Sequence, residues 1–375
     1  MKKIVFLSII SLFLSPSISK AEQFEYDTNF TLRALYGYFE PAKKFEKQIK
    51  RNHIPALANL ENKVTYIAND DLEFSFNTNI KAKSGNNLDN LNQGHWGEEV
   101  YINAFSQYGD FYFGQMENSS VMLGINKADL KIWQTTPTDI TDFAFNPNWN
   151  VNGKTKFYAT LNSTLSDTDA SALKFVYLTP EYKNTTLGVT YTFENNATDS
   201  LISKFSPYYK KSSYTISLYN YQEFNFADTQ FYASFADYKD SHFEYAGGFL
   251  LYRKGWSLFG SYRKTNISSS DTPITDYNKS INCLAYYDGF RKSEAYNLGI
   301  SYEFAYVTST FSYFDSSSNV SKAQNRIYNL HNSLKFDKNY ALYLGFAYVD
   351  FTSDDGVNIN GNKGLAAYTG LQFEF

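Results

Sequence analysis

The sequence predicts an all-β protein, a transmembrane antiparallel β-barrel. Three observations favour this fold class: a strictly alternating C-terminal segment that ends on an aromatic residue, an N-terminus typical of exported proteins, and many further segments with a two-residue period. Period-two alternation places successive side chains on opposite faces of an extended strand. A barrel wall needs this pattern, because one face contacts lipid and the other faces the lumen.

The C-terminal segment 364–375 is the most informative stretch of the chain. One face of the strand would carry Leu365, Ala367, Thr369, Leu371, Phe373 and Phe375. A terminal phenylalanine adds little to a soluble domain, whereas aromatic girdles anchor barrels at both membrane boundaries. Leu371, Phe373 and Phe375 resemble the C-terminal signal by which bacterial outer-membrane barrels are recognised for assembly. The alternative for this segment alone is an amphipathic edge strand of a soluble domain.

The N-terminus predicts a secretory signal peptide over residues 1–21. Lys2 and Lys3 precede the apolar stretch 4–14, and Ser19 and Ala21 supply the small residues of a cleavage site before Glu22. The apolar stretch is too short to span a membrane as a helix. Removing its three lysines leaves 31 basic against 38 acidic residues in the mature chain 22–375, a net charge of −7. We expect those residues to form a single exported domain.

The composition favours one large β structure without a catalytic or metal centre. Phe, Tyr and Trp number 33, 33 and 4, more than a soluble core needs. Cys283 is the single cysteine and cannot form an internal disulfide, and the four histidines lack metal-ligand spacing. No histidine lies in a recognisable nucleophile motif. We therefore expect no enzyme activity, no metal and no cofactor.

Seventeen segments of the chain read as strands. They are 24–38, 60–68, 72–82, 100–106, 111–115, 173–179, 186–193, 203–210, 214–223, 228–237, 242–252, 256–264, 294–303, 306–314, 325–336, 340–351 and 364–375. A bacterial single-chain barrel has an even number of strands, so one segment must lie outside the wall. We exclude 228–237, because the short links then all fall on one rim and the long polar links on the other. The sequence predicts sixteen strands, with fourteen or eighteen as alternatives.

Three stretches resemble the general porins of Gram-negative outer membranes, in their trimeric sixteen-stranded form. Residues 98–102 resemble a porin strand that begins with acidic residues. Residues 109–114 resemble the glycine turn after that strand and the strand that follows. Residues 177–182 and 187–191 resemble a Tyr-x-Ser-Pro turn and its next strand, and 368–375 the closing strand. Gln115 departs from the family, which usually has arginine at this position. The resemblance implies a homotrimer in the bacterial outer membrane, surrounded by lipid and lipopolysaccharide and inserted by the barrel assembly machinery. It implies no nucleic-acid partner.

The resemblance also implies a channel narrowed by a loop that folds into the lumen, at about residues 116–171. In porins, acids on this loop face a ladder of basic residues on the wall. The acids here would be Asp129, Asp139 and Asp142, and the wall bases would be Arg33, Lys63, Lys81, Lys83 and Arg263. Charges at a constriction set the ion preference of a channel. The alternative is that these charges are solvated loop and lumen residues without special pairing.

The expected function is passive diffusion of small hydrophilic solutes and ions, because a sixteen-stranded barrel leaves an aqueous channel. A channel selective for a sugar or an anion is the main alternative. A sugar channel would need a line of aromatic residues along the lumen, and a phosphate channel a lysine-rich constriction. A structural or adhesive barrel with a plugged lumen is a third class. It is disfavoured by small residues such as Gly188, Gly299 and Gly370, which we expect to point inward.

Overall fold

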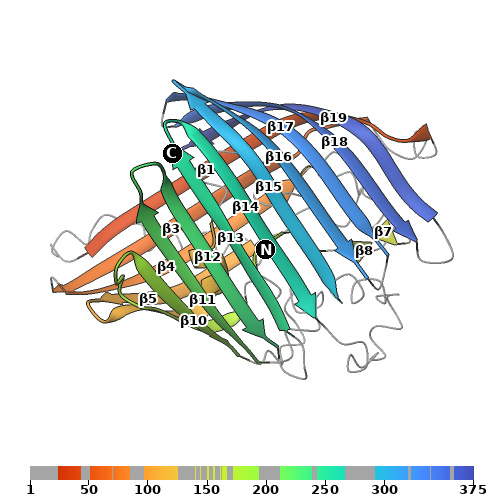
Figure 1. The fold of residues 1–375 in the computed structure, drawn as a ribbon. Coiled ribbons are helices and arrows are strands. Elements are labelled where there is room, and N and C mark those ends of the chain that lie inside the picture. The colour runs from red at the N-terminus through yellow and green to blue at the C-terminus, as the bar shows by residue number, and fades with distance from the viewer. Residues whose placement is uncertain are drawn as a thin grey trace, which may run out of the picture.

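The wall of the barrel is built from sixteen strands of the described chain (Figure 1). The computed structural model describes residues 24–43, 51–69, 71–84, 97–125, 140, 144, 150–151, 155–156, 161, 163–166, 172–193, 212–238, 243–266, 292–319, 322–337, 339–354 and 359–375. Each wall strand pairs antiparallel with its neighbour in the chain, and the last pairs with the first. The barrel is therefore closed, as predicted, and its wall has no free edge.

The wall strands have the following bounds. In order around the barrel they are β1 (Phe24–Glu40), β3 (Ala56–Asn69), β4 (Leu72–Ser84), β5 (Gly97–Ser106), β6 (Gly109–Gln115), β9 (Leu173–Leu178), β10 (Thr185–Thr192), β11 (Ser213–Glu223), β12 (Asp228–Asp237), β13 (Phe243–Arg253), β14 (Trp256–Asn266), β15 (Ser293–Phe304), β16 (Val307–Ser318), β17 (Gln324–Asp337), β18 (Tyr340–Asp354) and β19 (Ile359–Glu374). Smaller elements are β2 (Asn52–His53), which pairs with β1, the pair β7 (Asn150–Val151) and β8 (Thr155–Lys156), and the helix α2 (Ser119–Leu123). No helix in the described part of the chain is long and apolar enough to cross a membrane.

The predicted alternation decides which side chains face outward. On β19, Leu365 and Leu371 are 60% and 46% exposed, whereas Tyr368 and Gly370 on the opposite side are buried. Large exposed apolar side chains recur on the outer side of every wall strand, a surface that only a hydrocarbon solvent would stabilise. Gly188, Gly299 and Gly370 lie on the lumen-facing side of the wall, as predicted, because each pairs with a residue that also faces the lumen.

The links on the two rims differ in part as the sequence predicted. The links β3–β4, β5–β6, β9–β10, β11–β12, β13–β14, β15–β16 and β17–β18 are short and lie on one rim, where the C-terminus also lies (Figure 1). The β13–β14 turn needs backbone freedom, because Lys254 and Gly255 have φ values of +48° and +85°. On the other rim the links after β1, β4, β6, β10 and β14 are longer, whereas those after β12, β16 and β18 are also short. Short periplasmic turns and long external connections are the arrangement of outer-membrane barrels.

The exclusion of 228–237 from the wall is wrong, although the count of sixteen is right. These residues form β12, which pairs with β11 on one side and β13 on the other. The preceding link is a tight turn, in which Phe224 and Ala227 exchange backbone hydrogen bonds of 3.0 and 3.2 Å. Excluding 228–237 would have left 224–241 as one long external link, and this link therefore does not exist. Because β10 pairs directly with β11, no wall strand separates these two. The segment 203–210 lies outside the described residues.

Candidate pore lumen and its infolded segment

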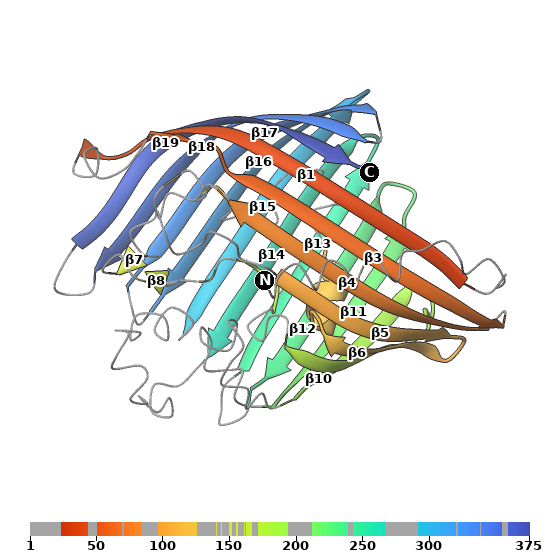
Figure 2. The same ribbon diagram turned by 180° about the vertical axis from the view of Figure 1, so that it is seen from behind.

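The two halves of the lumen face differ in chemistry. On β1, β3 and β5, Arg33, Glu61, Lys63 and Glu99 lie on the lumen-facing side and are at least partly exposed. The lumen face of β10–β17 carries mainly hydroxyl side chains, among them Thr190, Thr215, Ser217, Ser234, Ser261 and Thr310. Figure 2 shows β1, β3, β4 and β5 side by side, with β13, β14 and β15 on the wall behind them. A charged half of the wall thus faces a half lined by hydroxyl groups.

Two of the predicted wall bases lie in this charged half with defined partners. Nε and Nη2 of Arg33 donate to Oε1 of Gln372 at 2.9 and 2.6 Å, and its guanidinium lies 5.9 Å from the ring centre of Tyr343. The ammonium group of Lys63 lies 5.4 Å from the ring centre of Phe105. Both cations therefore lie against aromatic rings of the lumen face.

Lys81 and Lys83 also lie on the lumen-facing side of the wall. Their register partners on β3 are Asn59 and Leu57, which belong to the same lumen-facing rows as Lys63 and Arg33. The structure describes the backbone of these two lysines but not their side chains. The backbone thus places four of the five predicted wall bases on β1, β3 and β4.

The fifth predicted base, Arg263, lies in a different environment from the other four. It is fully buried on β14, where Nε and Nη2 donate to Oε2 of Glu244 on β13 at 3.1 and 2.8 Å. Glu244 is also fully buried, and its other carboxylate oxygen accepts a hydrogen bond from the hydroxyl of Tyr238. The positive charge of Arg263 is thus neutralised within the wall and is not presented to the channel water.

Gln115 lies on the outer side of the wall. Its register partners are Val100 and Leu173, which are 42% exposed on the membrane-facing side. The departure from the porin pattern at this position therefore leaves the described lumen face unchanged.

Residues 116–171 between β6 and β9 are called the infolded segment here. Several of its described residues lie against the lumen face, as the resemblance implied. The backbone N–H of Ser119 donates to Oγ1 of Thr190 on β10 at 2.8 Å, and Oγ of Ser120 donates to Oγ of Ser234 on β12 at 2.9 Å. The predicted acids Asp129, Asp139 and Asp142 lie outside the described residues.

The infolded segment also reaches a second part of the wall. Ile140, Ala144 and Leu161 are fully buried in one apolar cluster with wall residues of β1 and β16–β19. Phe39 of β1 and Phe351 of β18 are members of this cluster. Since 119–120 lie against β10 and β12, the segment contacts two separate arcs of the wall.

Three acids that sequence reasoning missed lie near one tyrosine. Glu61 on β3, Glu99 on β5 and Glu117 at the start of the infolded segment all interact electrostatically with Tyr101 on β5. Oε1 of Glu61 also accepts a hydrogen bond of 2.6 Å from Asn59. The two-residue period could have revealed Glu61, because it lies on the same strand face as Lys63. Glu117 could not be assigned in this way, because it lies outside any strand.

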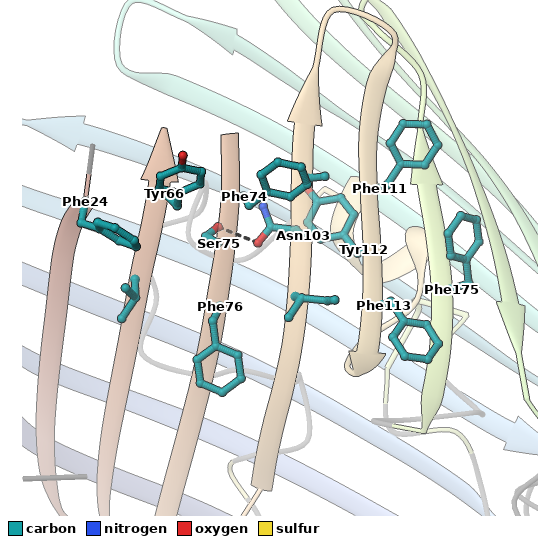
Figure 3. Close-up of a pocket in the computed structure, with 13 residues that line it drawn as sticks. Phe24, Tyr66, Phe74, Ser75, Phe76, Asn103, Phe111, Tyr112, Phe113 and Phe175 are labelled. Atoms are coloured by element: carbon teal, nitrogen blue, oxygen red, sulfur yellow. Dashed lines mark hydrogen bonds between the residues drawn. The ribbon is translucent and has the colours of Figure 1, made fainter. Parts of the chain in front are cut away.

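A hollow of about 430 Å³ on the outer side of β1–β9 is not a solute site (Figure 3). Phe74, Phe76, Ile102, Phe111 and Phe113 form its walls and are exposed on the membrane-facing side. Beneath them Oγ of Ser75 donates to Oδ1 of Asn103 at 2.7 Å. The apolar lining suits hydrocarbon or another protein surface rather than a hydrophilic solute.

No metal or catalytic arrangement is visible in the described ranges. No group of three His, Cys, Asp or Glu residues there is placed to hold a metal ion. His331 is buried on β17, with Nδ1 3.0 Å from the hydroxyl of Tyr368, which in turn donates to Asn329. Its hydrogen-bonding partner is thus a tyrosine of the wall and not a nucleophilic serine.

Comparison with known proteins shows likeness in structure. No protein-family model matches the chain, and no curated protein matches it. The OmpF of Salmonella typhi, solved with daunomycin, has a TM-score of 0.60 at 11% identity, covering 93% of this chain and 97% of that one. An anion-selective porin from Comamonas acidovorans has a TM-score of 0.59 at 13% identity, covering 94% of this chain and 100% of that one.

A third similar structure is the outer-membrane protein OmpT of Vibrio cholerae in its trimer form. Its TM-score is 0.56 at 12% identity, and the match covers 94% of this chain and 100% of that one. At such low identities the likeness shows the fold alone. The chain has the closed sixteen-stranded fold of the porins, with the exterior of an outer-membrane barrel.

Proposed function

We propose that this chain forms a water-filled channel for passive diffusion of small hydrophilic solutes and ions across a bacterial outer membrane. One observation carries the proposal: a closed sixteen-stranded barrel has a polar inner face and an apolar, aromatic outer face. Barrels of this size leave an aqueous interior. The similar structures are porins and outer-membrane proteins, which supports a channel over an enzyme.

The same architecture argues against a sugar-selective channel, which would need a line of exposed aromatic residues along the lumen. Lumen-side aromatic residues such as Tyr232, Phe259, Phe314 and Phe351 are buried, so they do not form an exposed line along the channel. The charged lumen half supports a general polar channel instead. We infer no enzymatic activity and no bound cofactor.

We propose that the constriction combines the infolded segment with the charged half of the wall. Asp129, Asp139 and Asp142 would supply negative charge on the segment, and Arg33, Lys63, Lys81 and Lys83 would supply positive charge on the wall. The attachment of residues 119–120 to β10 and β12 supports this arrangement, because it leaves β3–β5 as the opposite side of the opening.

We infer a homotrimer surrounded by outer-membrane lipid and lipopolysaccharide, by analogy with the trimeric OmpT structure. Insertion would depend on the barrel assembly machinery and on Leu371, Phe373 and Phe375. Crosslinking of the purified protein in detergent would test the trimer. A single crosslinked species of monomer size at saturating crosslinker would contradict it.

The function is tested by reconstitution into planar bilayers. We expect discrete conductance steps that scale with the salt concentration, and a reversal potential that reports cation or anion preference. In liposomes, entry of small sugars should follow their size and not saturate. A conductance blocked by one sugar at low concentration would instead support a selective channel, and no conductance at all would support a plugged barrel.

A further inference from the structure

The infolded segment is attached to the wall by two groups of contacts. The first group joins the two ends of the segment to each other and to β12. Asn118 caps α2, with Oδ1 accepting from the N–H groups of Ser120 and Val121 at 2.9 and 3.1 Å. Its Nδ2 donates to the carbonyl of Ser166, 48 residues away, at 2.7 Å. One buried side chain thus joins the outgoing and returning ends of the segment.

Three serine hydroxyls complete this first group. Oγ of Ser120 donates to Oγ of Ser234, which donates to Oγ of Ser166 at 3.1 Å. The backbone N–H of Ser166 in turn donates to Oγ of Ser120 at 3.3 Å. All three serines are buried, so each hydroxyl replaces hydrogen bonds to water that it has lost.

The second group holds the returning residues 163–166 against β12 and β14. The hydroxyl of Tyr232 donates to the carbonyl of Thr164 at 2.8 Å, and Oγ1 of Thr164 lies 2.7 Å from Oγ of Ser261. Nη1 of Arg263 donates to Oγ of Ser163 at 3.2 Å. The guanidinium therefore bonds Glu244 of the wall and Ser163 of the segment at the same time.

The ion pair Arg263–Glu244 lies where the returning residues contact the wall. A buried ion pair is costly unless its geometry is good and its remaining hydrogen-bonding groups are satisfied. An arginine can satisfy both requirements, because its planar fork presents donors in several directions. Arg263 uses Nε and Nη2 for Glu244 and Nη1 for Ser163. A lysine at this position would have a single nitrogen for both partners.

We propose that Arg263 and Glu244 are positioning residues of the channel, which set its open width by holding residues 163–166 against β14 through Ser163. The pair does not line the pore, and it does not set ion preference. This inference rests on the proposed channel function. Arg263 therefore differs in role from the other predicted wall bases: it holds the segment against the wall, whereas the bases of β1–β4 lie on the lumen-facing side.

The test removes the segment contacts while leaving the ion pair intact. The variant Ser163→Ala/Thr164→Val keeps Arg263, Glu244 and every charge of the protein. We expect hydrogen exchange of 163–166 to accelerate about tenfold or more, since hydrogen bonds to a buried charge and a buried hydroxyl are lost. In bilayers we expect increased open-channel current noise and frequent partial closures, with an unchanged reversal potential.

The matched control is Ser301→Ala. Ser301 is a buried hydroxyl on the lumen face of β15, and it makes no hydrogen bond to the described part of the infolded segment. This variant should retain wild-type exchange and noise. If Ser163→Ala/Thr164→Val behaves like Ser301→Ala in both measurements, the proposal is overturned.

A disulfide provides the converse experiment. In a Cys283→Ser background, Thr164→Cys/Ser261→Cys should form a bond between the segment and β14, because the two native hydroxyl oxygens are 2.7 Å apart. The open-channel current noise of the oxidised channel should equal that of the wild type, and the noise of the reduced channel should be higher. Equal noise in both states would contradict the proposal. If the wild-type protein forms no channel, the proposed function fails, and the exchange measurement still tests the attachment.

Discussion

Phe375 and Phe30 exchange two backbone hydrogen bonds, of 2.9 and 2.8 Å, at the seam where the last strand meets the first. The terminal residue therefore helps to close the barrel. Its side chain is 61% exposed on the membrane-facing side, at the rim of the short turns. The terminal aromatic that predicted a barrel thus has a structural role at the closing seam.

Deleting Phe375 should lower the amount of barrel in the outer membrane several-fold. The deletion removes both backbone bonds to Phe30 and the aromatic anchor at the interface. The measurement is the heat-modifiable folded fraction in outer-membrane extracts, with Phe375→Tyr as the control that keeps both features. Wild-type levels of the deletion variant would show that the last residue is not needed for assembly.

Placing arginine at Leu371 should impair insertion more than placing it at Thr31 on the lumen side. A lipid-facing arginine costs roughly 2–4 kcal/mol at mid-bilayer and less near the interfaces. Gly370 would be a poor control, because a Cβ there would come within 2.1 Å of Leu35. The readout is the urea midpoint of the folded barrel in lipid vesicles. Equal midpoints for the two variants would reject the assigned strand faces.

Gly188→Ala should displace α2 from the wall without preventing barrel formation. A Cβ at Gly188 would lie 2.6 Å from Cβ of Ser119 and 2.6 Å from Oγ of Ser217. Such overpacking costs about 1–3 kcal/mol, and the short helix can yield more readily than β10. We expect altered single-channel conductance with normal trimer yield. Gly247→Ala is the control, because its nearest neighbour would be 3.2 Å away.

Neutralising Asp129, Asp139 and Asp142 to asparagine should reduce cation preference, if these acids lie at the narrowest point. Negative charge at a constriction favours cations through its local potential, and its removal shifts the reversal potential toward anions. The shift should shrink at 1 M salt, where the screening length is about 3 Å. Asp71→Asn, in an exposed turn, is the control. An unchanged reversal potential would place the three acids away from the ion path.

The variant Glu61→Gln/Glu99→Gln should shift the reversal potential in the same direction. Both acids lie on the lumen face near Tyr101, so their loss removes negative charge from the part of the wall that also carries Lys63 and Arg33. Asp71→Asn/Glu181→Gln, at two exposed positions outside the wall strands, controls for the same change in net charge. If only the Glu61/Glu99 variant changes selectivity, the wall and not the infolded segment determines ion preference.

The sequence alone determined the barrel, the side that each strand turns to lipid, and most of the short turns on one rim. These features depend on a two-residue period and on turn residues, which are local properties of the chain. Leu371 could be placed outward and Gly370 inward without any knowledge of their neighbours. The lumen-facing sides of Arg33, Lys63, Lys81 and Lys83 followed from the same rule.

Only the tertiary structure decided which segments pair and which wall base is neutralised within the wall. Whether 228–237 belongs to the wall depends on pairing with β11 and β13, and a count of alternating segments cannot reveal it. Arg263 has the same pattern as the other wall bases, yet it is neutralised by Glu244 and bonded to Ser163, which is 100 residues away. Such contacts join residues far apart in the chain, so the period of a single strand carries no information about them.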